Sequence, residues 1–225
     1  MPQVDWLASV QGRYQLALAV RASGTHGILA LFEELDTQFA EIISERYVSS
    51  ILHAASFVPW LAHDGSARRR SWQCHAAPLS PEIDMTDRKL LDQIVTSPLA
   101  SLRELGKRCN LPASTVAYRF EKLLRCGVII GFTLVYDDRE AGAEGFVLSI
   151  STYGLAGTQY DALIARAGRN PAALWVVRML GEWDLEIGVS ISDVEKLNSL
   201  MRDVYMVGQG RVRQVAVHSV GTTYK

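Results

Sequence analysis

The amino-acid sequence predicts an α+β protein in which a winged helix-turn-helix is joined to a ferredoxin-like βαββαβ domain and preceded by a partial ββαβ copy of that domain. Three observations carry this prediction. Residues 84–137 hold three short helix patterns, with a tight turn between the second and the third. Residues 145–225 alternate strand and helix patterns in the order βαββαβ. Residues 1–62 repeat the last four of those elements.

The predicted helix-turn-helix begins with an amphipathic helix that Asp84 or Thr86 is placed to cap. Pro98 ends this helix, because proline removes a donor and disfavours helix in the residue before it. Ser101 and Glu104 have the spacing of a capping box and open a second, short helix. The apolar residues of the first helix share one face: Leu90, Leu91, Ile94 and Val95.

Asn110-Leu111-Pro112 forms the turn into a third helix, whose inner face carries Val116, Phe120 and Leu123. Cys126-Gly127 ends that helix, and residues 128–136 are predicted to form two short strands around Gly131, a wing. The outer face of the third helix combines hydroxyls, an aromatic ring and cations: Ser114, Thr115, Ala117, Tyr118, Arg119 and Lys122.

A helix with this outer face is typical of a recognition helix, whose first turns meet base edges while its cations meet phosphates. We therefore expect Ser114, Thr115 and Tyr118 near bases in a major groove, and Arg119 and Lys122 at phosphates or a guanine. Residues 84–136 contain eight Lys or Arg against five Asp or Glu, a net charge of +3, whereas the whole chain has a net charge of −1. A solvated helix face often shows a similar excess.

The run LxELGKRCNLPxSTVxYRFEKLLRCGVIxGF resembles the helix-turn-helix of the Lrp/AsnC (feast/famine) transcription regulators. The resemblance implies that a βαββαβ effector and assembly domain, of the RAM type, follows the DNA-binding domain. The pattern of residues 145–225 agrees with it. Strands are expected over residues 146–153, 173–180, 183–191 and 212–220, and helices at residues 158–167 and after a capping box of Ser192 and Glu195.

The N-terminal residues 1–62 repeat the C-terminal pattern at a separation of 169 residues. Residues 2–6 correspond to residues 171–175, and residues 12–16 to residues 181–185. His53 and His218 correspond after a small gap. The copy lacks the first strand and first helix, so we expect it to dock on the complete domain or on a second chain. Residues 63–83 are predicted to be a linker in which Arg68–Arg70 either touches DNA or is solvated.

Composition excludes several classes of site and protein. No apolar run approaches the roughly 18 residues that a membrane-spanning helix requires. Cys74, Cys109 and Cys126 have no metal-binding spacing, and they indicate a reduced, cytoplasmic protein with no disulfide framework. The five His residues lack the spacing of a metal site, and no nucleotide-binding loop is present. We expect neither cofactor nor metal.

Gly181 and Asp184 match the G-x-x-D motif of the Lrp/AsnC family, at a turn that borders the amino-acid site of many relatives. With the polar residues Ser149 and Ser151 they are the candidate ligand-binding residues. Asp184 has a structural alternative, in which it fixes the turn by accepting backbone N–H groups. The repeat carries Gln15 in place of Asp184.

The sequence thus predicts a regulator that binds double-stranded DNA, has an amino acid or related metabolite as its candidate effector, and forms a homo-oligomer away from any membrane. Two alternatives remain. Some proteins of this architecture are sirohaem decarboxylases of haem biosynthesis, but the cationic and hydroxyl-bearing face of the third helix favours the regulator over an enzyme. The other alternative is a remnant that has neither activity.

Overall fold

The computed structural model describes residues 3–22, 24–57, 71–75, 82–133 and 138–224. The chain divides into two compact units, which are described separately. The first comprises residues 1–75 and 133–225 and contains a single antiparallel sheet. The second comprises residues 76–132 and contains three helices. The predicted linker residues 63–70 and 76–81, with Arg68–Arg70, and the predicted wing residues 134–136 lie outside the described residues.

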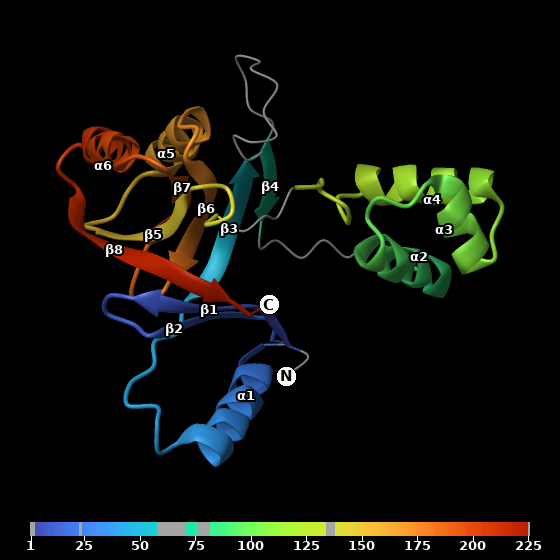
Figure 1. Ribbon diagram of the computed structural model, residues 1–225, viewed down its shortest axis with the longest axis horizontal. Coiled ribbons are helices and arrows are strands. Elements are labelled where there is room, and N and C mark those ends of the chain that lie inside the picture. Colours follow the sequence, from blue (N-terminus) through green and yellow to red (C-terminus); the bar gives the residue numbers. More distant parts are fainter. Residues whose placement is uncertain (1–2, 23, 58–70, 76–81, 134–137, 225) are drawn as a thin grey trace. The chain divides into compact units, whose positions relative to one another are not determined.

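The C-terminal half of the first unit has the predicted βαββαβ order. Its elements are β5 (Glu144–Thr152), α5 (Gly157–Arg169), β6 (Ala173–Leu180), β7 (Leu185–Ile191), α6 (Val194–Gly208) and β8 (Val212–Thr223). The strands lie in the order β8-β5-β7-β6, which is the ferredoxin-like arrangement. Both helices cover one face of these strands (Figure 1), where alternate apolar residues of β5 and β7, including Leu148, Ile150 and Ile187, are buried beneath them.

The N-terminal half contributes β1 (Val4–Gln11), β2 (Leu16–Val20), α1 (Gly24–Phe39) and β3 (Ser50–Phe57). β1 and β2 form a hairpin that pairs with β8, whereas β3 pairs with β6 at the opposite edge. A further strand, β4 (Ser71–His75), pairs with β3. The result is one eight-stranded sheet in the order β2-β1-β8-β5-β7-β6-β3-β4. The expected docking of the N-terminal half therefore takes the form of hydrogen bonding to both edges of the complete sheet.

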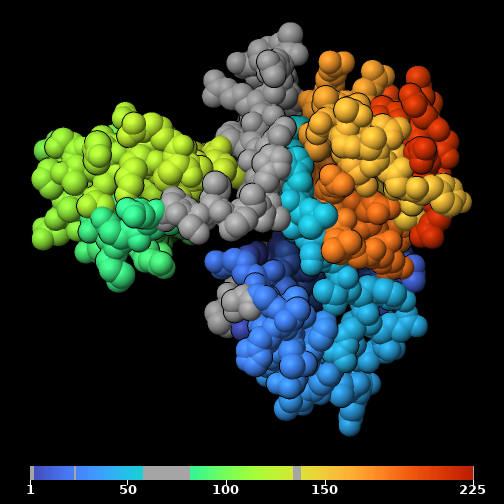
Figure 2. Space-filling model, turned by 180° about the vertical axis from the view of Figure 1, so that it is seen from behind, coloured from blue at the N-terminus to red at the C-terminus, as the bar shows by residue number. Residues whose placement is uncertain are grey.

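The N-terminal half is less buried than the half that it repeats. Leu16, Leu18 and Val20 on β2 are 52%, 42% and 37% exposed. Their counterparts on β7 are buried beneath α5 and α6, and the described residues of the N-terminal half contain no counterpart of α5. The space-filling view shows α1 and the segment after it, in blue and light blue, projecting beside the orange and red C-terminal half (Figure 2). Leu31 is the residue that α1 buries.

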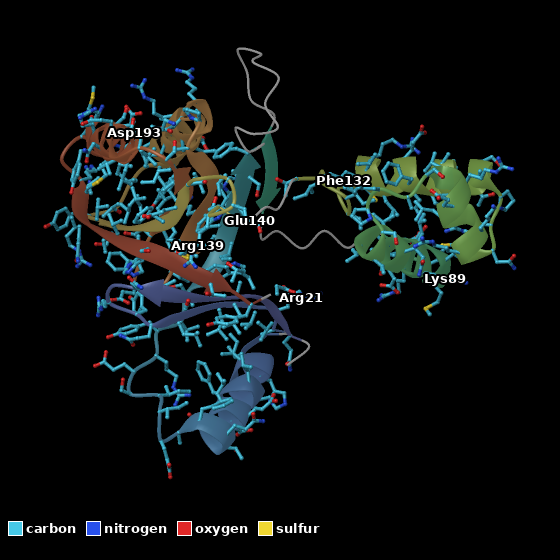
Figure 3. All side chains as sticks on the ribbon, viewed as in Figure 1. Arg21, Lys89, Phe132, Arg139, Glu140 and Asp193 are labelled. Atoms are coloured by element: carbon cyan, nitrogen blue, oxygen red, sulfur yellow. The ribbon has the colours of Figure 1, made fainter. Side chains whose placement is uncertain are left out.

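The second unit consists of α2 (Met85–Thr96), α3 (Leu102–Cys109) and α4 (Ala113–Arg125). Its core is formed by the predicted inner faces of the helices together with Ile129. Val95, which the sequence places on the inner face of α2, is instead 80% exposed. Asp84 caps α2, and Ser101 and Glu104 form the predicted capping box of α3. Phe132 stacks on Phe120 of α4 with ring centroids 6.2 Å apart (Figure 3).

Three further sequence predictions are wrong in detail. Residues 128–133 form no strand: Ile129 is buried in the helical core, and Phe132, which is 46% exposed, stacks on Phe120. Residues 71–75, predicted as linker, form β4, since the edge of β3 offers unpaired backbone groups. The cap of α6 is Asp193, whose carboxylate accepts a 2.9 Å hydrogen bond from Glu195 N, and Ser192 does not cap this helix (Figure 3).

Candidate functional site

The turn between α3 and α4 is fixed by backbone geometry. Asn110 adopts the left-handed conformation (φ 58°, ψ 48°), which asparagine tolerates better than most residues. Leu111 N donates a 2.8 Å hydrogen bond to Gly106 O. A Cβ on Gly106 would lie 2.7 Å from Leu111 O, so this close approach requires glycine. The turn thereby sets the direction in which α4 leaves α3.

The outer face of α4 presents several of the predicted DNA-contacting residues to solvent. Ser114 is exposed, Thr115 and Ala117 are half-buried, and the Tyr118 residue is 65% exposed. The opposite face of α4 is anchored by Val116 and Leu123, both fully buried. This arrangement leaves two hydroxyls and an aromatic ring available on the first two turns of the helix, which are the turns that a recognition helix presents to bases.

Arg119 and Lys122, in contrast, are engaged within the unit. Arg119 donates hydrogen bonds of 2.7 Å to both Asp84 and Asp87 at the start of α2. Lys122 Nζ lies 3.0 Å from Asp87 Oδ2 and 3.1 Å from Glu82 O. The Asp87 side chain is completely buried. These contacts give both cations a structural role, in which they hold α4 against the N-terminus of α2.

The electrostatics of this network favour the charged form of each carboxylate. Burial alone would raise the pKa of Asp87, but the hydrogen bonds from Arg119 and Lys122 outweigh it, so the pKa is lowered. The hydrogen bond from Arg119 likewise lowers the pKa of Asp84. Backbone and side-chain hydrogen bonds from Ser101 lower the pKa of Glu104 at the start of α3.

Two other cations lie beside the start of α4, and sequence reasoning missed their position. Arg103 and Lys107 line a shallow groove at the α3–α4 turn together with Asn110 and Ala113. Both are exposed on α3. The signal was available, since residues 103 and 107 are four apart and lie opposite the buried Leu105 and Cys109.

The predicted ligand-binding residues of the C-terminal half are all engaged in contacts within the chain. Asp184 accepts hydrogen bonds from Thr152 N (2.7 Å) and Thr152 Oγ1 (3.0 Å), so it ties the β6–β7 turn to the end of β5. A Cβ on Gly181 would lie 2.7 Å from Ser49 Cβ. The structural alternative for Asp184 is thus supported by its two hydrogen bonds.

Ser149 and Ser151 lie on the face of β5 that points away from α5 and α6, and both are buried. Ser149 Oγ donates a 2.8 Å hydrogen bond to Glu186 Oε1. Burial raises the pKa of Glu186, although the hydrogen bond from Ser149 opposes this effect. Ser151 Oγ accepts a 3.2 Å hydrogen bond from Arg213 Nε. Ser149, Ser151 and Asp184 therefore all make side-chain hydrogen bonds to neighbouring residues of the same sheet unit.

Comparisons with known proteins show which family and which solved structures this chain is similar to. A winged helix-turn-helix DNA-binding family model matches residues 83–130. The uncharacterized HTH-type transcriptional regulator PH1916 of Pyrococcus horikoshii is 30% identical over 136 residues, which cover 57% of this chain and 90% of that relative. The AsnC family transcriptional regulator of Agrobacterium tumefaciens is similar in structure, with a TM-score of 0.51, 20% identity and coverage of 63% of this chain and 92% of that one. The chain belongs to a family of HTH-type transcriptional regulators, and its fold is that of an AsnC-family structure.

A further structure of similar fold is the transcriptional regulator NMB0573 of Neisseria meningitidis in complex with L-Met, with a TM-score of 0.50 and 18% identity, covering 62% of this chain and 90% of that one. These relatives are named as regulators, which favours the regulator over the sirohaem decarboxylase. No helix of the described residues is both long and apolar enough to span a bilayer. Within the same residues, no group of three His, Cys, Asp or Glu side chains could hold a metal ion.

Proposed function

We propose that this protein is a sequence-specific regulator of transcription, of the Lrp/AsnC type, that reads duplex DNA with α4. The observation that carries the proposal is the exposed first half of α4, where Ser114, Thr115 and Tyr118 lie on the side away from the helical core. Arg103 and Lys107 stand beside the same end of α4, where phosphate contacts would orient the helix. We further propose that the protein acts in the cytoplasm and that chains self-associate.

The DNA-contacting residues are proposed in two groups. Ser114, Thr115, Ala117 and Tyr118 face bases, and Arg103 and Lys107 face phosphates. The sequence prediction that Arg119 and Lys122 also contact DNA remains a prediction. Each would have to give up an ion pair with Asp87 to do so, or contact DNA with the donors that the pair leaves unused. Arginine has five N–H donors, so the second route is open to Arg119.

Fluorescence anisotropy with labelled duplex DNA from the protein's own upstream region, in a series of salt concentrations, tests this proposal. The steepness of log K against log salt falls by about 0.9 for each phosphate that the protein no longer neutralises. The double substitution of Arg103 and Lys107 by Ala should therefore lower it by up to about two, while the matched substitution Arg169→Ala on α5 should leave it unchanged. Tyr118→Ala should reduce discrimination between the cognate site and competitor DNA. Binding that is no tighter to any duplex than to competitor DNA at low salt would refute the proposal.

We also propose that a small amino acid modulates the protein near Gly181, Asp184, Ser149 and Ser151. Support comes from the G-x-x-D motif and from the bound L-Met of the NMB0573 structure. A thermal-shift screen of the twenty amino acids tests it, because a ligand present at a hundred times its Kd stabilises the folded state by about 2.7 kcal/mol. The absence of any stabilisation at millimolar concentrations would count against an amino-acid effector.

A further inference from the structure

The two halves of the sheet unit correspond residue by residue. Adding 169 to the number of a residue in the β1–β2 hairpin gives its counterpart in β6–β7. Val4 pairs with Val20, and Ala173 pairs with Val189 in the same way. The register irregularity that follows Val4 recurs after Ala173. The repeat is therefore present in strand pairing as well as in sequence.

The contacts between the two halves obey the same rule. Ser50 of β3 pairs with Leu180 of β6, and Ser219 of β8 pairs with Gln11 of β1. The second pairing follows from the first when each residue is replaced by its counterpart in the other half. Two further pairs of contacts repeat this relation: Ile51 with Met179 and Val220 with Val10, and Ala54 with Val177 and Thr223 with Ala8. An interface that is unchanged when its partners are exchanged is isologous, the arrangement of a two-fold dimer. Here it lies within one chain.

The turns beside these strands show the same exchange. A Cβ on Gly12 would lie 2.7 Å from His218 Nδ1, and a Cβ on Gly181 would lie 2.7 Å from Ser49 Cβ. Ser49 is thus the counterpart of His218, at the constant separation of 169 residues. The sequence alignment that paired His53 with His218 through a gap is wrong, because the strand register admits no gap.

The centre of this interface is occupied by counterparts that contact each other. Arg13 forms an ion pair with its own counterpart, Glu182. Trp183 Nε1 donates a 3.0 Å hydrogen bond to the hydroxyl of its counterpart, Tyr14, which donates a 2.5 Å hydrogen bond to Glu182. Residues that meet their own counterparts lie on the pseudo-two-fold axis. At this axis the two halves are chemically complementary.

The same chemistry disfavours identical halves as partners. Two copies of the C-terminal half would place Glu182 against Glu182 at the axis, and like charges in an interface oppose association. They would also place Trp183 against Trp183, where two indole N–H groups have no acceptor in each other. The Arg13–Glu182 ion pair and the hydrogen bond from Trp183 to Tyr14 can form only between unlike halves.

We propose that residues 3–57 act as a built-in second subunit that occupies both edges of the C-terminal sheet, and that the Arg13–Glu182 pair at the pseudo-two-fold axis selects this half over a second copy of the C-terminal half. The partner that fits the edges of β6 and β8 is the chain's own N-terminal half. Association between chains then uses other surfaces.

Hydrogen–deuterium exchange on the full chain, in the variants Arg13→Glu, Glu182→Arg and the double variant, tests this proposal. Each single variant places like charges at the axis, so amides at both edges, in residues 8–11 and 50–56, should exchange faster together, on the order of tenfold. The double variant restores an opposite-charge pair and should return both edges to near wild-type exchange. Arg166→Glu is the matched control, because the Arg166–Asp203 pair on α5 and α6 has a similar side-chain exposure of 49% and 16%, against 46% and 22% for Arg13 and Glu182.

Amides in the centres of β5 and β7 report whether the C-terminal half remains folded in every variant. Faster amide exchange at only one edge would overturn the proposal. A double variant whose edge amides exchange as fast as those of the single variants would also overturn it. Sedimentation velocity of the same samples tests selection against a second copy. The Arg13→Glu chain should form no larger species than the wild type, because Glu182 still opposes Glu182. Larger species formed through the freed edges would overturn the selective role of this pair.

Discussion

The substitution Asp87→Asn tests the conclusion that the buried carboxylate holds α2 and α4 together. Asp87 is fully buried and accepts charge-assisted hydrogen bonds from Arg119 (2.7 Å) and Lys122 (3.0 Å). A hydrogen bond to a charged group contributes about 1.5–3 kcal/mol. Arg119 keeps its bond to Asp84, and an amide oxygen replaces one acceptor, so we expect a loss of about 2–3 kcal/mol in the free energy of unfolding of the helical unit.

Thermal and urea unfolding, followed by the circular dichroism of the helices, measures this loss. About 1 kcal/mol lowers the Tm of so small a domain by roughly 4–8 °C, so a fall of about 10 °C or more is expected. Asp92→Asn, an exposed change on the same helix, is the control and should remain within about 0.5 kcal/mol of wild type. A variant as stable as the wild type would refute the structural role of the pair.

The pH dependence of Asp87→Asn follows from the lowered pKa of Asp87 in the folded state. Such a group stabilises the fold above its unfolded pKa of about 3.9, and this stability is lost as pH falls through the lower folded pKa. The wild-type unit should therefore lose stability below about pH 4 more steeply than the variant. Equal slopes would contradict the role assigned to the Asp87 charge.

Three further predictions concern single side chains. Burial and the charge of Arg13 lower the pKa of His218 in the folded state. Protonation therefore favours the unfolded state, and the sheet unit should lose stability as pH falls below about 6.5. Urea titrations at a series of pH values should show a flatter dependence for His218→Gln. The Cβ of Gly106→Ala would lie 2.7 Å from Leu111 O, so the turn must shift, and chemical unfolding should show a loss of about 1–3 kcal/mol in the free energy of unfolding of the helical unit. Gly157→Ala, whose Cβ meets nothing within 4 Å, should change it little. Asp184→Ala removes both hydrogen bonds to Thr152 and should speed amide exchange at the end of β5, and unchanged exchange there would contradict its structural role.

Most helices and strands could be predicted from local patterns, because hydrophobic periodicity and helix caps depend on residues a few positions apart in the sequence. The capping box of Ser101 and Glu104, for example, follows from spacing alone. The role of Arg119 could not be predicted in this way. Its outward position on α4 indicates DNA, but its partner Asp87 lies 32 residues earlier, and only the packing of α2 on α4 brings the two together.

The strand β4 shows a second limit of sequence reasoning. Residues 71–75 alternate polar and apolar residues over only five positions, and they lie in a stretch rich in Gly, Ser, Pro and Arg, so the composition favours a linker. The edge of β3 supplies the missing condition, since backbone hydrogen bonds to a partner strand do not depend on side-chain type. The gap assumed between His53 and His218 failed for a related reason. Two similar side chains were matched, whereas strand register is set by backbone pairing.

The ion pair between Arg13 and Glu182 has a consequence for how this interface can change over time. In a symmetric dimer a substitution at the axis is present in both subunits, so the new side chain must pack against an identical one. Here each position of the pair belongs to a different stretch of one gene, so Arg13 and Glu182 are free to vary separately. The covalent connection also raises the effective concentration of each half at the other. A weak axis contact is therefore sufficient, and a chain of this kind can acquire chemically unlike halves without first forming a tight complex between separate molecules.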